Sequence, residues 1–307
     1  PKWQNATCNF RAADVHAGDC IYIATTDLTS FRTTTSYLHA FAEIKDGITA
    51  PYVLITHNGD LSTPDGDDWH PHEKNANEWN ETFSSWLNDP LLTQWFASNC
   101  HWRGASKPKK LACIPIGLEN RYIGTDHGRI SRIVFQAKKR STPEIKKPDD
   151  PLVLVAFDEN KLKPDRAAAL NALVGKSFVN RVGRVGYGEW QELVKSHPFV
   201  ACPIGHGLDT HRTWEVLLLG SVPIVHSTSL DEVYDGLPVL VVKEWSDVNI
   251  DLLRKWLNET FPSTSLSRAT MPYWKDRILR AKKTSTTHTS TDEIKIHDEK
   301  IGADFYI

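Results

Sequence analysis

The sequence contains a single methionine, Met271, and it begins with proline rather than with an initiator methionine. We therefore expect a processed chain, from which a signal peptide or an upstream membrane anchor has been removed.

Long apolar runs are also lacking. The longest segment without a charged residue spans 216–230 and contains Gly220 and Pro223, so it is too short and too interrupted for a transmembrane helix.

Neither sign of charge is in excess, because 36 Lys and Arg residues stand against 38 Asp and Glu residues, for a net charge of -2. General nucleic-acid binding needs a basic surface, so this composition argues against that class of protein. Charged residues make up 24% and hydrophobic residues 40% of the chain, which excludes global disorder. A length of 307 residues is enough for two domains with separate cores.

Only five cysteines occur, and no two of them form a CxxC pair, which argues against a cysteine zinc site. Cys8 with Cys20, and Cys100 with Cys113, are spaced to close short loops in an oxidising compartment. Cys202 lies in an apolar run and is predicted to be a buried free thiol. N-glycosylation sequons begin at Asn5, Asn80 and Asn258, which favours a secretory protein only slightly.

Several nucleotide and hydrolase motifs are missing as well. The Gly-rich segment 183–188 lacks GxGxxG spacing and follows no strong predicted strand. No GxxxxGK[ST] loop and no GxSxG elbow are present. These absences weaken the dehydrogenase, NTPase and α/β-hydrolase interpretations.

The first half mixes short apolar runs with polar loops. Strands are predicted at 21–26, 52–56 and 111–116, and helices at 31–45 and 83–98. The segment 138–151 carries three prolines and five basic residues without apolar periodicity, so we interpret it as an interdomain linker. The resulting domains are 1–140, 151–283 and a tail over 284–307.

The second half alternates strands and helices regularly. Strands are predicted at 152–157, 199–202, 222–225 and 239–242, and helices at 165–176, 189–196, 209–219, 248–260 and 273–283. This alternation favours an α/β fold, in which helices cover both faces of a parallel sheet. Ligands bind such sheets at the carboxyl ends of the strands, and two such domains in tandem would enclose a cleft.

The most informative stretch is 203–225, which reads PIGHGLDTHRTWEVLLLGSVPIV. A strand leads into a loop with Gly205, and Asp209 stands where a helix N-cap is expected. Such a helix start favours a phosphate, and Arg212 in its first turn adds a guanidinium. Glu215 lies on the same helix face and suits a ribose diol, although Arg212 and Glu215 also fit an ordinary surface ion pair.

This stretch resembles the C-terminal motif of exostosin-like glycosyltransferases. The motif has an apolar strand, Pro-x-Gly, Arg-x-x-Glu and Gly-x-x-Pro, matched here by Phe199, Pro203, Gly205, Arg212, Glu215, Gly220 and Pro223. The resemblance implies a GT-B fold, with two Rossmann-like domains facing a central cleft and the sugar nucleotide bound mainly by the second. It also implies that Arg212 holds the diphosphate and Glu215 the ribose.

Two further segments follow predicted strands. In GT-B enzymes, which the resemblance suggests, a cation after the first strand of the second domain neutralises the leaving diphosphate. Arg166 is our first candidate for it, ahead of Lys161 and Lys163. In the first domain, inverting transfer would need a base. Asp60 is the first choice and His57 the second, with Glu119 as a further candidate. A tight turn at 57–60, in which Asp60 and Asn58 only satisfy backbone groups, explains this segment at least as well.

We therefore interpret the chain as a glycosyltransferase that moves a hexosyl or pentosyl group from a nucleotide sugar, with a UDP-sugar expected, to a hydroxyl of a glycan or glycoprotein. No metal is expected, because Pro71 interrupts the segment 69–73 and prevents its two histidines from lying on one face of a helix. A sugar-nucleotide epimerase or hydrolase, and a non-catalytic carbohydrate-binding protein, are the alternatives. A eukaryotic protein would lie in the Golgi lumen or secretory pathway, and a bacterial one in the cytoplasm or at the membrane periphery.

Overall fold

The computed structural model describes residues 11–25, 37–65, 83–118, 152–159 and 163–286. They belong to two compact units, the first drawn from 1–116 and 272–304 and the second centred on 117–271. The predicted linker lies outside the described residues, as does most of the predicted tail. Within the described part, no helix has the length and apolar character needed to cross a membrane.

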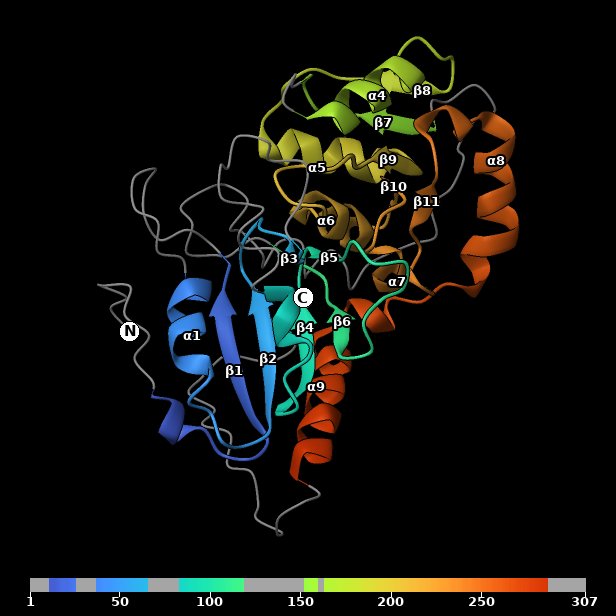
Figure 1. Ribbon diagram of the computed structural model, residues 1–307. Coiled ribbons are helices and arrows are strands. Elements are labelled where there is room, and N and C mark those ends of the chain that lie inside the picture. The colour runs from blue at the N-terminus through green and yellow to red at the C-terminus, as the bar shows by residue number, and fades with distance from the viewer. Residues whose placement is uncertain (1–10, 26–36, 66–82, 119–151, 160–162, 287–307) are drawn as a thin grey trace. The chain divides into compact units, whose positions relative to one another are not determined.

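The first unit contains a parallel four-stranded sheet in the order β1-β2-β4-β6 (Figure 1). Its elements are β1 (Asp19–Ala24), α1 (Tyr37–Lys45), β2 (Tyr52–His57), β4 (Leu92–Ala97) and β6 (Leu111–Cys113), with a small parallel pair of β3 (Thr63–Pro64) and β5 (Cys100–His101). Val53 and Leu54 of β2 are fully buried, because β-branched and aliphatic side chains suit a central strand.

The helix predicted over 83–98 is wrong in its second half, which forms β4. Trp86, Trp95 and Phe96 are spaced as on one face of a helix, but Pro90 and the turn before it separate them. All three aromatic rings are buried, and the rings of Trp86 and Trp95 stack with centroids 5.7 Å apart. The buried aromatic residues belong to two different elements, and their spacing along the sequence resembles the apolar face of a single helix.

The C-terminal helix also differs from the predicted domain extent. From Pro272 on, helix α9 (Met271–Thr286) groups with the first unit, whereas the residues that precede it belong to the second. The hydroxyl of Ser285 donates a hydrogen bond to Oγ1 of Thr93 in β4, with a separation of 2.7 Å. The chain therefore returns to its first unit after completing the second.

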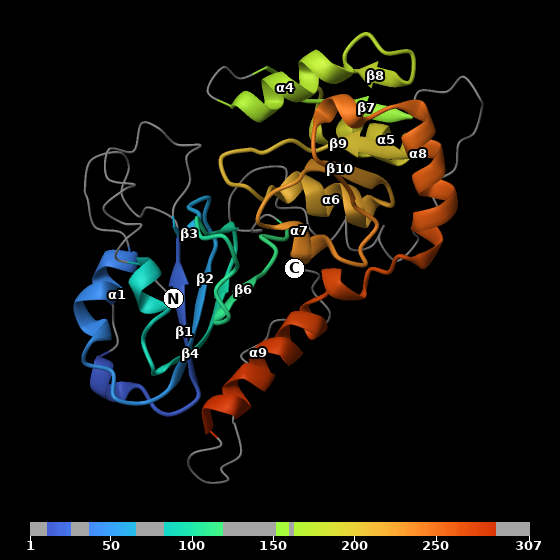
Figure 2. The same ribbon diagram turned by 45° about the vertical axis from the view of Figure 1, so that its right-hand side comes forward.

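The second unit contains a parallel five-stranded sheet in the order β11-β10-β9-β7-β8 (Figure 2). Its strands are β7 (Val153–Val155), β8 (Val179–Arg181), β9 (Phe199–Ala201), β10 (Val222–His226) and β11 (Leu240–Val242). Its helices are α4 (Pro164–Leu173), α5 (Tyr187–Ser196), α6 (His211–Leu219), α7 (Asp231–Tyr234) and α8 (Ile250–Lys255), which a π-helical turn extends over Trp256–Thr260. Short 3-10 turns lie at Ala12–Asp14, Trp245–Asp247, Phe261–Ser263 and Ser267–Ala269.

Alternate residues of these strands build the core of the second unit. Val153, Val155, Phe199 and Ala201 share one face of the sheet and pack with side chains of α4 and α8. Leu154 and Val200, which alternate with them, are equally buried on the other face. The two Rossmann-like α/β domains predicted from the sequence are confirmed by the two parallel sheets.

The strand order of the second unit contains a topological switch. The chain leaves β7 through α4 to reach β8 on one side, and then crosses through α5 to β9 on the other side of β7. In doubly wound sheets, ligands bind beside the carboxyl ends of the two strands that flank such a switch. The loops after β7 and β9 are therefore where a ligand site is expected.

Candidate functional site

A pocket of about 780 Å³ lies at this switch point, within the second unit. Residues that directly follow β7, β8 and β9 line it together with residues of α4, α5 and α6. These are Ala156, Phe157, Asp158, Arg166, Arg184, Val185, Gly186, Tyr187, Trp190, Pro203, Thr210, His211, Arg212 and Glu215. A pocket of this size fits a drug-sized ligand or a nucleotide.

Arg212 is fixed at the pocket wall by backbone and aromatic contacts. Its Nη1 atom donates to the carbonyl oxygen of Ala156 at 2.9 Å, and its guanidinium lies 5.8 Å from the ring centroid of Phe157. Both partners directly follow β7, so the first strand of the unit positions a side chain of α6. The fixed guanidinium is suited to bidentate binding of an anion.

Arg166, in the first turn of α4, is the second cation of the pocket. Burial lowers its pKa, and the positive charge of Arg212 lowers it further. Its Nε atom is buried and has no hydrogen-bond partner among the described residues. Two guanidinium groups that repel each other, one of them with an unused donor, form a site that an anion would stabilise.

Glu215 supplies a buried carboxylate at the same pocket, with a relative exposure of 2%. Its Oε1 atom accepts a hydrogen bond from the hydroxyl of Tyr187 at 3.0 Å. Because Arg212 bonds to Ala156 and Glu215 to Tyr187, the two residues of the Arg-x-x-Glu pattern have different partners. The pocket thus combines two adjacent cations with a carboxylate on the next turn of α6.

Gly205 is not a lining residue, but it stands beside two of them. A Cβ atom at this position would come within 2.9 Å of Cγ2 of Thr210 and 3.9 Å of Nη2 of Arg166. Glycine is thus needed for the close approach of Thr210, at the start of α6, to the loop after β9.

Asp209 was predicted as the N-cap of α6, and this is wrong, because the helix begins at His211 after Thr210. The Asp209 carboxylate is buried and accepts hydrogen bonds from Nε1 of Trp214 at 2.8 Å and from the hydroxyl of Tyr234 at 3.3 Å. It is absent from the lining of the pocket in the described part of the chain. These contacts indicate that Asp209 anchors the loop before α6.

Asp165, next to Arg166, ties the loop after β9 to α4. Its Oδ2 atom accepts from the backbone N–H of Ile204 at 2.8 Å, and its Oδ1 atom from Nε1 of Trp245 at 2.7 Å. Nδ1 of His226 lies 2.9 Å from the same Oδ1 atom. These buried contacts fix the start of α4, and with it the backbone of Arg166. Of the alternatives to Arg166, Lys163 precedes α4 and is buried, and Lys161 lies outside the described residues.

The pocket also contains residues that the sequence reasoning missed, namely Arg184, Tyr187 and Trp190. They follow β8, a three-residue strand with half-buried side chains, which was not predicted. The Gly-rich segment 183–188 therefore does follow a strand. Its composition was the available signal, since Gly-rich loops after strands commonly approach ligands closely.

The candidate bases lie in the first unit, at the carboxyl end of β2. His57 is the last residue of β2, and Asp60 is exposed in the turn that follows. Nε2 of His57 lies 3.0 Å from the carbonyl oxygen of Pro115, which can only accept, so Nε2 carries the proton. If the ring is neutral, Nδ1 is then its acceptor nitrogen, as a base requires. Glu119 lies outside the described residues.

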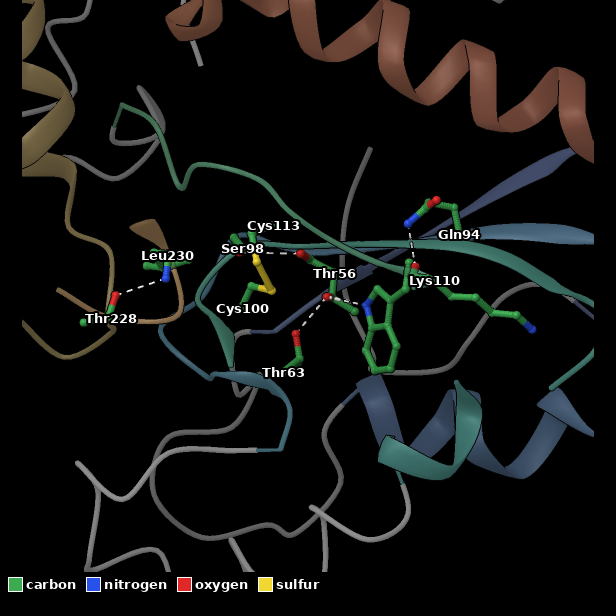
Figure 3. Close-up of a disulfide and its surroundings, with 10 residues drawn as sticks. Thr56, Thr63, Gln94, Ser98, Cys100, Lys110, Cys113, Thr228 and Leu230 are labelled. Atoms are coloured by element: carbon green, nitrogen blue, oxygen red, sulfur yellow. Dashed lines mark hydrogen bonds between the residues drawn. A yellow bond between two sulfur atoms is a disulfide. The ribbon is translucent and has the colours of Figure 1, made fainter. Parts of the chain in front are cut away.

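A disulfide joins the two segments that hold this turn (Figure 3). Cys100 and Cys113 are bonded as predicted, with their Cα atoms 5.3 Å apart. Nδ2 of Asn99 donates to the carbonyl oxygen of Gly59 at 2.8 Å, so the segment beside Cys100 contacts the turn after β2. Pro115, the partner of His57, follows Cys113 by two residues.

The remaining cysteines have different environments. Cys202 is a buried free thiol, as predicted, and burial raises its pKa to about 12. Cys20 is an exposed free thiol, and its predicted partner Cys8 lies outside the described residues. Within the described ranges, no group of three His, Cys, Asp or Glu side chains is arranged to hold a metal ion. The histidine motif over 69–73 lies outside them.

No protein-family model and no curated protein sequence matches the chain. Similar solved structures include two UDP-forming α,α-trehalose-phosphate synthases, from Burkholderia xenovorans and Burkholderia vietnamiensis. The first is 11% identical over 87% of this chain and 74% of its own, with a TM-score of 0.39. The second is 9% identical over 90% and 73%, with a TM-score of 0.36. AviGT4, a glycosyltransferase involved in avilamycin A biosynthesis, is 11% identical over 86% and 98%, with a TM-score of 0.32.

Likeness at this level does not carry a functional conclusion, and the resemblance to exostosin-like enzymes stays a prediction. The function therefore has to be inferred from the pocket.

Proposed function

We propose that the chain is a glycosyltransferase that moves a sugar from a nucleotide-sugar donor, a UDP-sugar, to a hydroxyl of a glycan or glycoprotein. The observation that carries this proposal is the pocket at the switch point of the second unit, where Arg166 and Arg212 adjoin the buried carboxylate of Glu215. Adjacent cations suit a diphosphate, and a carboxylate suits the ribose diol. The Gly-rich segment that follows β8 lines the same pocket.

The two arginines have two roles in the proposed reaction. Arg166 and Arg212 bind the diphosphate of the donor, and they stabilise the negative charge that develops on it as the glycosidic bond breaks. This role needs no bound metal. His57 or Asp60 takes the proton of the acceptor hydroxyl in the proposed inverting reaction.

The disulfide between Cys100 and Cys113 supports a further part of the proposal. Disulfides persist in oxidising compartments, so a eukaryotic protein of this kind would act in the Golgi lumen or secretory pathway.

Calorimetric titration with UDP, GDP and ADP tests the donor site directly. We expect wild-type protein to bind one of these, and Glu215→Ala and Arg212→Ala to weaken that binding at least tenfold. Arg280→Met serves as a control, because Arg280 is exposed and pairs with Asp276 on α9. Unchanged affinity in both pocket variants would refute the site assignment.

A second assay distinguishes transfer from its alternatives. With a UDP-sugar and a glycan acceptor, a transferase forms a new glycosidic product. Release of free sugar or of an epimer without an acceptor would indicate the hydrolase or epimerase instead. Glycan binding without any nucleotide binding would indicate a carbohydrate-binding protein.

A further inference from the structure

Tyr187 connects two helices of the second unit at the lining of the pocket. It is the first residue of α5, after the N-cap Gly186, in the loop that leaves β8. Its hydroxyl donates to Oε1 of Glu215 on α6, with an oxygen–oxygen distance of 3.0 Å. Both side chains line the pocket, so this hydrogen bond lies where a ligand would contact Glu215.

Neighbouring side chains fix the ring of Tyr187. It stacks on the indole of Trp190, one turn further along α5, with ring centroids 5.6 Å apart and planes inclined by 12°. Leu218 of α6, which is fully buried, packs against the same ring. A ring held in this way gives its hydroxyl one defined position.

The protonation state of Tyr187 is also defined. Burial raises the pKa of Tyr187, and the carboxylate of Glu215 raises it further, so the phenol stays protonated at neutral pH. A protonated phenol donates its hydrogen bond, and an ionised carboxylate accepts it. Because the hydrogen bond holds one carboxylate oxygen in place, it restricts the rotation of the carboxylate.

We propose that Tyr187 is a positioning residue, which orients Glu215 toward the ribose diol and thereby makes the pocket select ribonucleotides over 2′-deoxyribonucleotides. This inference rests on the proposed function, in which Glu215 binds the ribose. It adds the residue that controls sugar selectivity in the nucleotide part of the donor. The hydroxyl of Tyr187 acts through Glu215.

The test compares UDP with 2′-deoxy-UDP by calorimetry in wild type and Tyr187→Phe. Phenylalanine keeps the ring stack and removes only the hydroxyl. We expect the preference for UDP over 2′-deoxy-UDP to fall about tenfold, which corresponds to about 1.4 kcal/mol. The loss should come from weaker UDP binding, while the Kd for 2′-deoxy-UDP stays within about twofold. A general loss of packing would weaken both ligands equally.

Tyr234→Phe is the matched control. Tyr234 is likewise a buried tyrosine whose hydroxyl donates to a carboxylate, that of Asp209, but it does not line this pocket in the described part of the chain. We expect its preference for UDP to equal that of wild type. In a double-mutant cycle, Tyr187→Phe should reduce the preference no further when Glu215→Gln is already present.

The outcomes separate this inference from the function on which it rests. An unchanged preference in Tyr187→Phe, or an equal fall in Tyr234→Phe, overturns the role of Tyr187 while UDP binding by wild type still supports the donor site. If wild-type protein binds none of UDP, GDP and ADP, the donor site and this inference both fail. If Tyr187→Phe does not fold, Glu215→Gln alone decides, since an unchanged preference there also overturns the inference.

Discussion

Replacement of Arg166 by methionine should stabilise the empty protein and weaken the ligand complex. Methionine keeps most of the aliphatic stem, which packs at the start of α4, and removes the guanidinium. In the empty pocket this guanidinium is repelled by Arg212, and its buried Nε atom has no acceptor among the described residues. The wild-type side chain therefore costs folding free energy, which the carboxylate of Asp158 only partly offsets and which a bound anion would recover.

The size of each effect follows from the contacts. A buried donor without a partner costs about 1–3 kcal/mol, and because Arg166 is only half-buried we take the lower end, about 1 kcal/mol. A domain of this size gains about 2–4 °C in Tm for each kcal/mol. Hydrogen bonds to charged groups contribute about 1.5–3 kcal/mol, so the Kd for UDP should rise about 10- to 100-fold.

Scanning calorimetry with and without UDP measures both effects on one sample. Arg166→Met should have the higher Tm without nucleotide and the smaller increase in Tm when UDP is added. Arg280→Met should match wild type in both measurements. A lower Tm of the empty variant, or a Kd for UDP within twofold of wild type, would refute the view that Arg166 is held in place for an anion.

Three further predictions concern other parts of the chain. Replacement of Cys100 and Cys113 by serine should cost about 3 kcal/mol of unfolding free energy in denaturant titration, because the bond closes a loop with a sequence separation of 13 residues; an unchanged midpoint would contradict this. Asp60→Asn or His57→Ala should lower kcat by about 10²- to 10⁴-fold for whichever residue is the base, with an unchanged Kd for UDP; two fully active variants would exclude both candidates. Cys202, whose pKa is raised to about 12 by burial, should react with thiol reagents at pH 8 only after unfolding, as peptide mapping would show; labelling of the folded protein would disprove its burial.

The second unit was the more predictable part of the fold. Its strands are short apolar runs between helices of ordinary length, so local pattern and tertiary structure agree. Gly220 illustrates this agreement: it ends α6 with φ at 100°, in the left-handed region, as a glycine after a helix predicts. Strand β8 escaped prediction because its Asn180 and Arg181 are half-buried, which leaves no apolar run to detect.

The candidate site was predictable where a residue shares a helix with another candidate or follows a predicted strand, as Arg166 does. Arg212 and Glu215 share α6, and their spacing of three residues already suggested a common face. Tyr187 and Trp190 join them through the order of the strands, since α5 crosses the sheet from β8 to β9. The prediction of Asp209 as an N-cap was wrong because side chains, one of them distant in the sequence, determine its contacts. Its position suits an N-cap, but Tyr234 and Trp214 engage its carboxylate, and local spacing does not reveal those contacts.

The environment of Glu215 gives the strongest physical reason to regard this pocket as functional. The neighbouring residues of α6 on both sides, Trp214 and Val216, are fully buried, and Glu215 itself is nearly so. An apolar side chain of similar size would avoid the desolvation cost of a carboxylate at such a position, a cost that the hydrogen bond from Tyr187 helps to offset. Burial likewise disfavours the positive charge of Arg166, and its buried Nε atom has no hydrogen-bond partner among the described residues. A ligand with a diphosphate and a diol would interact with both groups at once, so one molecule would account for a carboxylate and a guanidinium in the same pocket.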